Sequence, residues 1–267
     1  MQISRSVYYK WHSFGPVVPN KDEAMLKDKI RTLFKKSKNT YGTRRLVKAM
    51  KEAGIEMGRF KTRRLMAELG LEARYPKKYR ATTDSNHKLG IAPNILDRQF
   101  NPTKPNQVWA TDISYVWTLE GFVYIATIMD LYSRQIVGWA IDDHMKTSLC
   151  LQALRMAYWR KKPEPGLLHH SDRGSQYASN DYREQLKKMG MRQSMSRKGN
   201  CWDNSPKERF FRSLKYECLN YERLSNKEMA KLCTIDFIAF YNGQRMHSSL
   251  AYKTPLAYEQ EFYRKTV

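Results

Sequence analysis

The chain is 267 residues long and strongly basic, with 48 lysines and arginines against 26 aspartates and glutamates, a formal net charge of +22 and a pI near 9.8. Such a charge favours a nucleic-acid partner. No apolar run approaches the roughly 18 residues of a membrane helix, and the amino terminus has no signal-like apolar core, so we expect neither a membrane span nor export. The 4 cysteines include no C-x-x-C pair, which argues against a zinc module or a disulfide framework and fits a reducing, cytoplasmic setting.

The basic excess is concentrated in the first third of the chain, because residues 1–90 hold 22 basic and 8 acidic residues. Apolar residues recur there at helical intervals, which predicts helices over residues 22–36, 43–53 and 58–69. The pattern fits a helix-turn-helix domain over residues 1–72 that binds DNA, and equally a small basic bundle with no such role. In the third helix we expect apolar residues inward and basic ones around the rest: Phe60, Leu65, Met66 and Leu69 inward, and Arg59, Lys61, Arg63 and Arg64 outward.

Residues 73–105 lose this periodicity and gain prolines and basic residues, which predicts an irregular basic linker. Residues 106–267 alternate strand and helix patterns before a helical carboxyl-terminal tail. Three antiparallel strands followed by strand–helix alternation predict an α/β fold with a mixed five-stranded sheet and flanking helices. We expect strands over residues 108–117, 122–130, 134–141, 167–171 and 192–196, and helices over residues 146–160, 180–189 and 205–218.

One carboxylate lies in the middle of the first expected strand, where aspartate is uncommon. Period-2 alternation places Asp112 on the same strand face as Ala110 and Ser114, small neighbours that leave room for a ligand. A carboxylate on a partly buried strand face costs free energy unless it is paired or binds a metal. Asp112 is therefore the hardest of the acids to explain by structure alone.

Two further acids have a structural explanation as well as a functional one. Asp172 ends a short apolar strand before an arginine–glycine pair, at the sheet edge where ligands bind in open α/β folds, but it also suits an ordinary turn. Glu208 lies in a helix that we expect to start with Ser205 as N-cap and Pro206 at the first helical position, where on local pattern alone a capping box explains it. Four more acids near the ends of expected elements are not excluded by spacing: Asp130, Asp142, Asp143 and Asp203.

The segments around these three acids form a set with one segment near the carboxyl terminus. They are Trp109-Ala110-Thr111-Asp112-Ile113, His170-Ser171-Asp172-Arg173-Gly174-Ser175-Gln176-Tyr177, Lys198-Gly199-Asn200-Cys201-Trp202-Asp203-Asn204-Ser205-Pro206 leading to Glu208, and Tyr241-Asn242-Gly243-Gln244-Arg245 with His247, Leu250 and Thr254-Pro255. The set resembles the retroviral-integrase-like DDE transposases, specifically the OrfB-type proteins of the insertion-sequence-three family, over roughly residues 41–260. The 35 residues between Asp172 and Glu208 match the spacing of that family.

The resemblance implies a ribonuclease-H-like fold and a DNA transposase, a polynucleotidyl transferase that cleaves and joins DNA strands. It implies that Asp112, Asp172 and Glu208 are catalytic and hold Mg²⁺ or Mn²⁺, two ions in each active site, which suits in-line displacement at phosphorus. Lys215, about two helical turns after Glu208, matches the family's basic residue and is expected to hold a DNA phosphate. Lys207 departs from the pattern, since an apolar residue is expected there.

Further DNA contacts are expected from charge and from the resemblance. Tyr41-Gly42 ahead of Arg44-Arg45, and Arg64-Leu65-Met66, resemble the family's helix-turn-helix segment. In the loop before Glu208, Trp202 is expected either to stack on a base or to anchor the loop to the core. The expected contacts are Arg44, Arg45, Arg59, Lys61, Arg63, Arg64, Lys198 and Trp202.

The expected partners are double-stranded DNA, as the element's terminal inverted repeats and its target, and further copies of the chain, because two DNA ends must be held together. The family's enzyme is usually fused to an upstream OrfA-type protein that this chain does not include, so we expect this chain alone, on the bacterial nucleoid, either to be inactive or to modulate the fusion. Two other functions remain open: a ribonuclease-H-like nuclease that cuts without joining, and a DNA-binding regulator whose acids are inactive.

Overall fold

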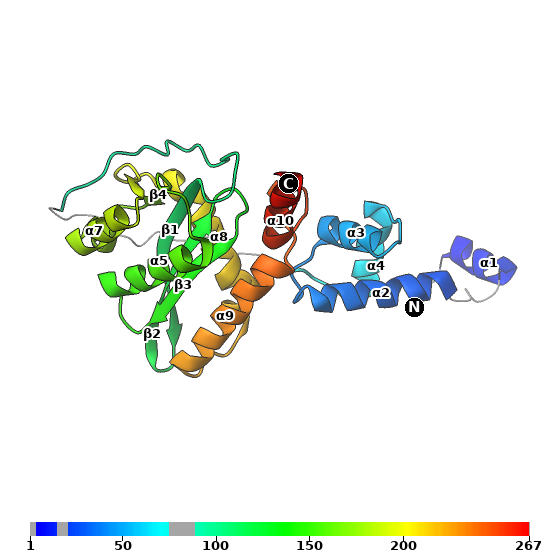
Figure 1. Ribbon diagram of the computed structural model, residues 1–267. Helices are drawn as coiled ribbons and strands as arrows, with labels where there is room; N and C mark the ends of the chain where they lie inside the picture. Colours follow the sequence, from blue (N-terminus) through cyan, green and yellow to red (C-terminus); the bar gives the residue numbers. More distant parts are fainter. Residues whose placement is uncertain (1–3, 15–20, 75–88, 267) are drawn as a thin grey trace. The chain divides into compact units, whose positions relative to one another are not determined.

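The computed structural model describes residues 4–14, 21–74 and 89–266 (Figure 1). The chain divides into two compact units, residues 1–73 and residues 74–267. None of the described helices combines the length and the apolar content that a membrane crossing requires.

The first unit is all helical, and the three helices predicted from periodicity are confirmed. Its helices are α1 (Arg5–Phe14), α2 (Lys21–Lys36), α3 (Thr43–Glu52) and α4 (Arg59–Glu68). The buried side chains of α2, α3 and α4 form a shared apolar core that includes Ile30, Leu46, Met50 and Leu65.

The prediction that Phe60 points inward is wrong, because its side chain is 91% exposed. The buried face of α4 is set by Thr62, Leu65 and Met66, which lie three and four residues apart. Phe60 precedes Thr62 by two residues, which places it about 200° around the helix and therefore on the solvent face.

The second unit is built on a five-stranded sheet, and the five predicted strands are confirmed. The strands are β1 (Val108–Thr118), β2 (Gly121–Asp130), β3 (Ile136–Asp142), β4 (Leu168–Ser171) and β5 (Arg192–Met195). Their order is β3-β2-β1-β4-β5, with β1 antiparallel to β2, β2 antiparallel to β3, and β4 parallel to both β1 and β5. This is the mixed sheet expected for a ribonuclease-H-like fold.

Helices follow the strands as predicted, and the carboxyl-terminal tail is helical. The larger ones are α5 (Thr147–Lys161), α7 (Asn180–Lys188), α8 (Ser205–Glu217), α9 (Lys227–Gly243) and α10 (Pro255–Thr266), and the short turns are α6 (Ser175–Ala178), η1 (Cys201–Asn204), η2 (Leu219–Tyr221) and η3 (Ser248–Leu250).

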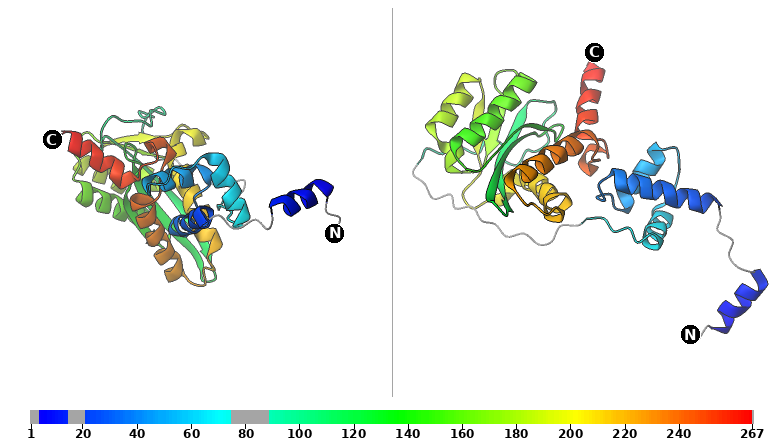
Figure 2. Two further views of the ribbon diagram at one scale, coloured as in Figure 1. Left: turned by 90° about the vertical axis from the view of Figure 1, so that its right-hand side faces the viewer. Right: turned by 90° about the horizontal axis from the view of Figure 1, so that it is seen from below.

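The two faces of the sheet carry separate cores, because successive strand residues point to opposite faces. Val108 and Ala110 pack with α8 and α9 on one face, whereas Trp109 packs with α5 and α7 on the other (Figure 2). Asp112 continues the series of Val108 and Ala110, so its carboxylate lies on the face that α8 covers.

Part of the predicted linker packs on the second unit. Residues 75–88 lie outside the described residues, but residues 89–105 run irregularly along the sheet domain. Leu96 is buried in the core of α8 and α9, and the N–H groups of Ile95 and Leu96 donate to Ser194 Oγ at 2.9 and 3.1 Å.

Close packing of α5 on β3 gives a first prediction. A Cβ added at Gly138 would lie 2.3 Å from the carbonyl oxygen of Ala153 and 2.7 Å from Ala157 Cβ. Gly138→Ala should therefore force α5 away from the sheet and lower the free energy of unfolding by roughly 1–3 kcal/mol or more, measured by thermal denaturation. Gly243→Ala is the matched control in the same unit, because its added Cβ would meet only Leu256 at 3.7 Å. Equal stability of the two variants would contradict the packing.

Candidate active site

The register between β1 and β4 brings the first two acids together. The strands are parallel, with Ala110 opposite His170, so two residues further along each strand come Asp112 and Asp172. The strand β4 ends at Ser171, and from that point β1 continues with one edge unpaired by β4. The two carboxylates are thus delivered to the carboxyl end of the β1–β4 pair, where this sheet opens.

Backbone N–H groups orient both carboxylates. The N–H of Ile113 donates to Asp112 Oδ1 at 2.9 Å, and the N–H of Gly174 donates to Asp172 Oδ1 at 2.9 Å. The hydrogen bond from Gly174 forms the turn that the structural interpretation of Asp172 predicted. It does not compete with a functional role, because it also fixes the direction of the carboxylate.

The third acid comes from α8, which packs on β1. Burial first, and then the negative charges of Asp172 and Glu208, raise the pKa of Asp112 to about 8. Desolvation also raises the pKa of Glu208. Three elements therefore bring carboxylates near one another, and the other two oppose the ionisation of Asp112, although nearly a hundred residues of sequence separate Asp112 from Glu208.

The capping-box explanation of Glu208 is not what the structure shows. The predicted N-cap at Ser205 is wrong: the cap is Asn204, whose side chain makes no capping hydrogen bond, and Ser205 is the first residue of α8. The reason is that the turn η1 runs directly into α8 and displaces the start of the helix by one residue. Within the described part of the chain, the Glu208 carboxylate has no hydrogen bond or ion pair.

A buried lysine lies in the wall of this site. Lys207 is fully buried and donates a hydrogen bond to Thr127 Oγ1, and Thr127 lies directly opposite Asp112 in the β1–β2 register. Its Nζ lies 4.9 Å from the ring centroid of Phe210 and 5.0 Å from that of Phe211. Burial lowers the pKa of Lys207, while the carboxylate of Asp112 opposes that shift.

Lys215 lies on the same helix, nearer the mouth of the site. Its Nζ lies 5.0 Å from the ring centroid of Tyr115 on the open part of β1. Burial lowers the pKa of Lys215, and the charge of Asp112 again opposes the shift. Lys215, which is predicted to bind a DNA phosphate, therefore interacts electrostatically with Asp112.

Two of the other acids have structural partners. The buried carboxylate of Asp203 accepts from Arg98 Nε at 2.8 Å, from Arg197 Nε at 2.9 Å and from Asn94 Nδ2 at 3.0 Å, and these donors hold its pKa well below the usual range. Asp130 accepts from the hydroxyl of Ser133 at 2.7 Å within its own turn.

The loop between β5 and α8 is therefore anchored through Asp203 and not through its tryptophan. Trp202 is 69% exposed, so the interpretation of Trp202 as a core anchor is wrong. Lys198 is exposed as well. Both side chains face solvent on the loop that leads to Glu208.

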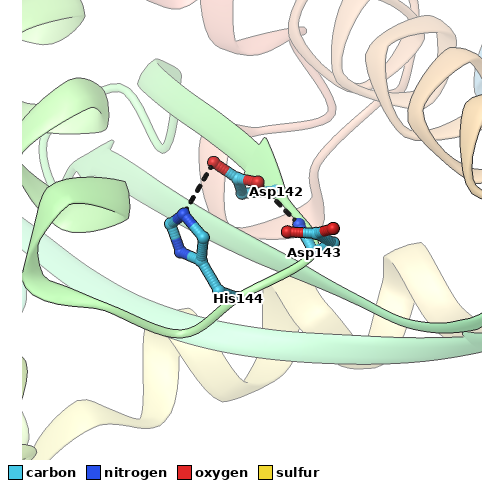
Figure 3. Close-up of side chains that lie close together, drawn as sticks. All are labelled: Asp142, Asp143 and His144. Atoms are coloured by element: carbon cyan, nitrogen blue, oxygen red, sulfur yellow. Dashed lines mark hydrogen bonds and ion pairs between the residues drawn. The ribbon is translucent and has the colours of Figure 1, made fainter.

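A different acidic group lies at the end of β3 (Figure 3). Ligand atoms of Asp142, Asp143 and His144 lie within 4.8 Å of one another, closer than those of the candidate site. Their carboxylates already have partners: His144 Nε2 lies 3.3 Å from Asp142 Oδ2, and Lys227 Nζ lies 3.3 Å from Asp143 Oδ2. In β2, Tyr124 lies opposite Asp142, whereas Thr127, three residues further along, lies opposite Asp112. This group is therefore separate from the candidate site.

The two histidines before the second acid belong to the core. His170 contacts Ser194 Oγ at 2.9 Å and Ser196 Oγ at 3.2 Å, and His169 contacts the hydroxyl of Tyr182 at 3.2 Å. Burial lowers the pKa of His169 to about 3 and that of His170 to about 4. Both rings are neutral structural groups at neutral pH.

The predicted DNA contacts of the first unit differ in their surroundings. Arg45 is half-buried, with its guanidinium 5.8 Å from the ring centroid of Tyr41. Arg64 binds Glu23 and Glu68, each at 2.9 Å, so it is engaged within its own unit. Arg44, Arg59, Lys61 and Arg63 are exposed, as is the ion-paired Arg64.

Sequence reasoning missed two residues of the site. It noted Lys207 only as a departure from the family pattern, and it did not single out Thr127. Strand alternation could have placed Thr127 opposite Asp112 once the hairpin register was known. The contact between Thr127 and Lys207 needed the packing angle of α8 as well.

Comparisons with known proteins agree with this architecture. The integrase core domain family matches residues 102–201 and again residues 189–255, and the HTH-like domain family matches residues 20–79. In fold, the chain is similar to the simian T-cell lymphotropic virus intasome solved by cryo-electron microscopy with the PP2A regulatory subunit B56 gamma. The TM-score is 0.53 at 15% identity, covering 80% of this chain and 70% of that chain.

Two curated relatives match over nearly their whole length. The insertion element IS600 uncharacterized 31 kDa protein of Shigella sonnei is 44% identical over 263 residues, covering 98% of this chain and 97% of the relative. Transposase InsF for insertion sequence IS3A of Escherichia coli K12 is 34% identical over 267 residues, covering 98% and 92%. The chain therefore belongs to the IS3 family of insertion-sequence transposases, and it is a DNA transposase with an integrase core of ribonuclease-H-like fold.

Proposed function

We propose that Asp112, Asp172 and Glu208 are the catalytic carboxylates of this transposase. The observation that carries the proposal is the β1–β4 register, which sets Asp112 beside Asp172 at an open sheet edge, together with the approach of Glu208 from α8. Burial opposes ionisation of Asp112 and Glu208, and neighbouring negative charges oppose that of Asp112, so a cation among the acids would lower their free energy. No structural partner accounts for Glu208 within the described residues.

These carboxylates suit Mg²⁺ or Mn²⁺, which prefer oxygen ligands, and we propose that they hold two ions. Such a pair, when bound, activates an attacking oxygen and stabilises the leaving oxygen during displacement at phosphorus. The chain's own groups do the positioning: the N–H groups of Ile113 and Gly174 hold two carboxylates in place, and Lys215 binds a phosphate oxygen beside them. Water attack at the element's end frees a 3′-hydroxyl, which then attacks a second phosphodiester.

DNA binding and catalysis are assigned to different units of the chain in this proposal. We propose that residues 1–72 form the DNA-binding domain, that residues 73–105 connect it to the core, and that residues 106–267 carry out catalysis. Exposed basic residues of α3 and α4 would contact the terminal inverted repeats, while Lys198 and Trp202 would contact the strand near the acids. Joining two ends requires at least two copies on DNA, and an OrfA-type partner would contribute further contacts.

Removal of one carboxylate tests the site. Asp172→Asn keeps the size of the side chain but lowers its affinity for a divalent ion, so joined product on labelled terminal-repeat DNA should fall at least about a hundredfold in Mg²⁺. Asp143→Asn is the matched control, because it alters the second acidic group and should retain strand transfer. A gel assay reads both. Loss of activity only in Asp143→Asn would move the site to the end of β3, and cleavage without joining by the native chain would favour a nuclease.

Arginines of α4 test the DNA-binding surface. Arg59→Ala should weaken binding to repeat DNA and reduce the slope of log affinity against log salt by about 1, because one phosphate contact is lost. Arg64→Ala should instead lower the thermal stability of the first unit with a smaller effect on the salt slope, because Arg64 is engaged with Glu23 and Glu68. Fluorescence anisotropy across a salt series measures the slopes, and equal slopes for both variants would contradict the assignment.

The pKa of Asp112 predicts how stability depends on pH without metal. Burial raises this pKa to about 8 in the folded chain from an ordinary value of 3.8, so the unfolded chain loses the proton first. The native chain should therefore lose stability as pH rises from about 4 towards 7. Asp112→Asn removes this loss, so its urea midpoint in EDTA should gain on that of the native chain over the same range. A pH-independent difference would show that Asp112 ionises equally in both states.

A further inference from the structure

A lysine is buried beside the proposed catalytic acids. Lys207 is fully buried, and lysine is rarely so unless it is paired. Within the described residues its Nζ forms no ion pair within 4.0 Å. Its contacts are the hydroxyl of Thr127 and the faces of Phe210 and Phe211, which stabilise an ammonium through hydrogen bonding and the negative ring faces.

The ammonium is held on the same sheet face as the first acid. Thr127 pairs with Asp112 across β1 and β2, and directly opposed residues point to the same face with Cβ atoms roughly 5 Å apart. Lys207 is bound to that threonine and interacts electrostatically with Asp112. Its neighbour Glu208, in the same first turn of α8, also interacts electrostatically with Asp112. The position is thus fixed by a strand, a helix and two rings, and it is not a surface lysine that swings in.

We propose that Lys207 is a positioning residue that acts as a fixed internal cation of the acid site and weakens its affinity for divalent ions. The inference rests on the proposed function of Asp112, Asp172 and Glu208. An ammonium near these carboxylates offsets part of their mutual repulsion when no ion is bound. It also repels an incoming divalent cation, because both positive charges occupy the same negative field. An apolar side chain at this position would do neither.

Direct metal titration tests this role without relying on activity. The full-length chain, free of DNA, is titrated with Mn²⁺ by calorimetry. Lys207→Met keeps the length of the side chain but removes its charge, so the dissociation constant for Mn²⁺ should fall by roughly tenfold. Lys207→Gln, which keeps a donor for Thr127, should shift the constant in the same direction. It also provides a second reading should the Met variant fold poorly.

Two controls separate the possible failures. Lys161→Met removes another largely buried lysine, one paired with Glu259 and remote from the acids, and should leave Mn²⁺ affinity at the native value. Asp112→Asn should abolish the binding heat. If it does not, the metal site proposed above is wrong. If binding depends on Asp112 but neither Lys207 variant binds Mn²⁺ more tightly, the role of Lys207 is overturned while the site stands.

Discussion

The structure depends on the parallel pairing of β1 with β4. Paired residues of these strands lie sixty positions apart in the chain, yet the register decides which side chains meet at the open edge of the sheet. A slip of one residue would turn Asp172 towards the opposite face, where α5 and α7 pack, and would leave Asp112 alone. The apolar residues that flank the acids hold this register, because Val108 and Leu168 lie opposite each other within the core of α8 and α9.

The acid site illustrates a balance between binding and folding. Asp112 and Glu208, whose burial opposes ionisation, are unfavourable beside a third acid in a metal-free chain, and the two cores on either side of the sheet supply the stability that tolerates them. The surroundings also limit the cost. Backbone N–H groups bind two of the acids, the third lies at the exposed start of a helix, and two lysines of α8 bring positive charge. Repulsion is thereby contained at one place, where a cation can use it.

Much of this arrangement could be predicted from the sequence. Strand alternation placed Asp112 and Trp109 on different faces of β1. Apolar periodicity predicted α2, α3 and α4 of the first unit nearly to the residue. Two predictions were wrong because they followed the residue type and not its position within the local element. Phe60 is an apolar residue typical of a core, but it lies at the angular position of a surface residue. Ser205 is a typical N-cap residue, but η1 ends at Asn204, which takes the cap position. The hydroxyl that binds Lys207 lies eighty residues away, beyond any local pattern.

The hydrogen bonds to Asp203 connect segments that are far apart in the chain. Asn94 and Arg98 precede the sheet, Arg197 follows β5, and all three grip one carboxylate two residues before α8 begins. The segment that enters the second unit is therefore fixed, through this one carboxylate, to the start of the helix that bears Glu208. The N–H groups of Ile95 and Leu96 add a second attachment, to Ser194 Oγ in β5. A pull on this segment would therefore be shared between the last strand of the sheet and the helix of the third acid.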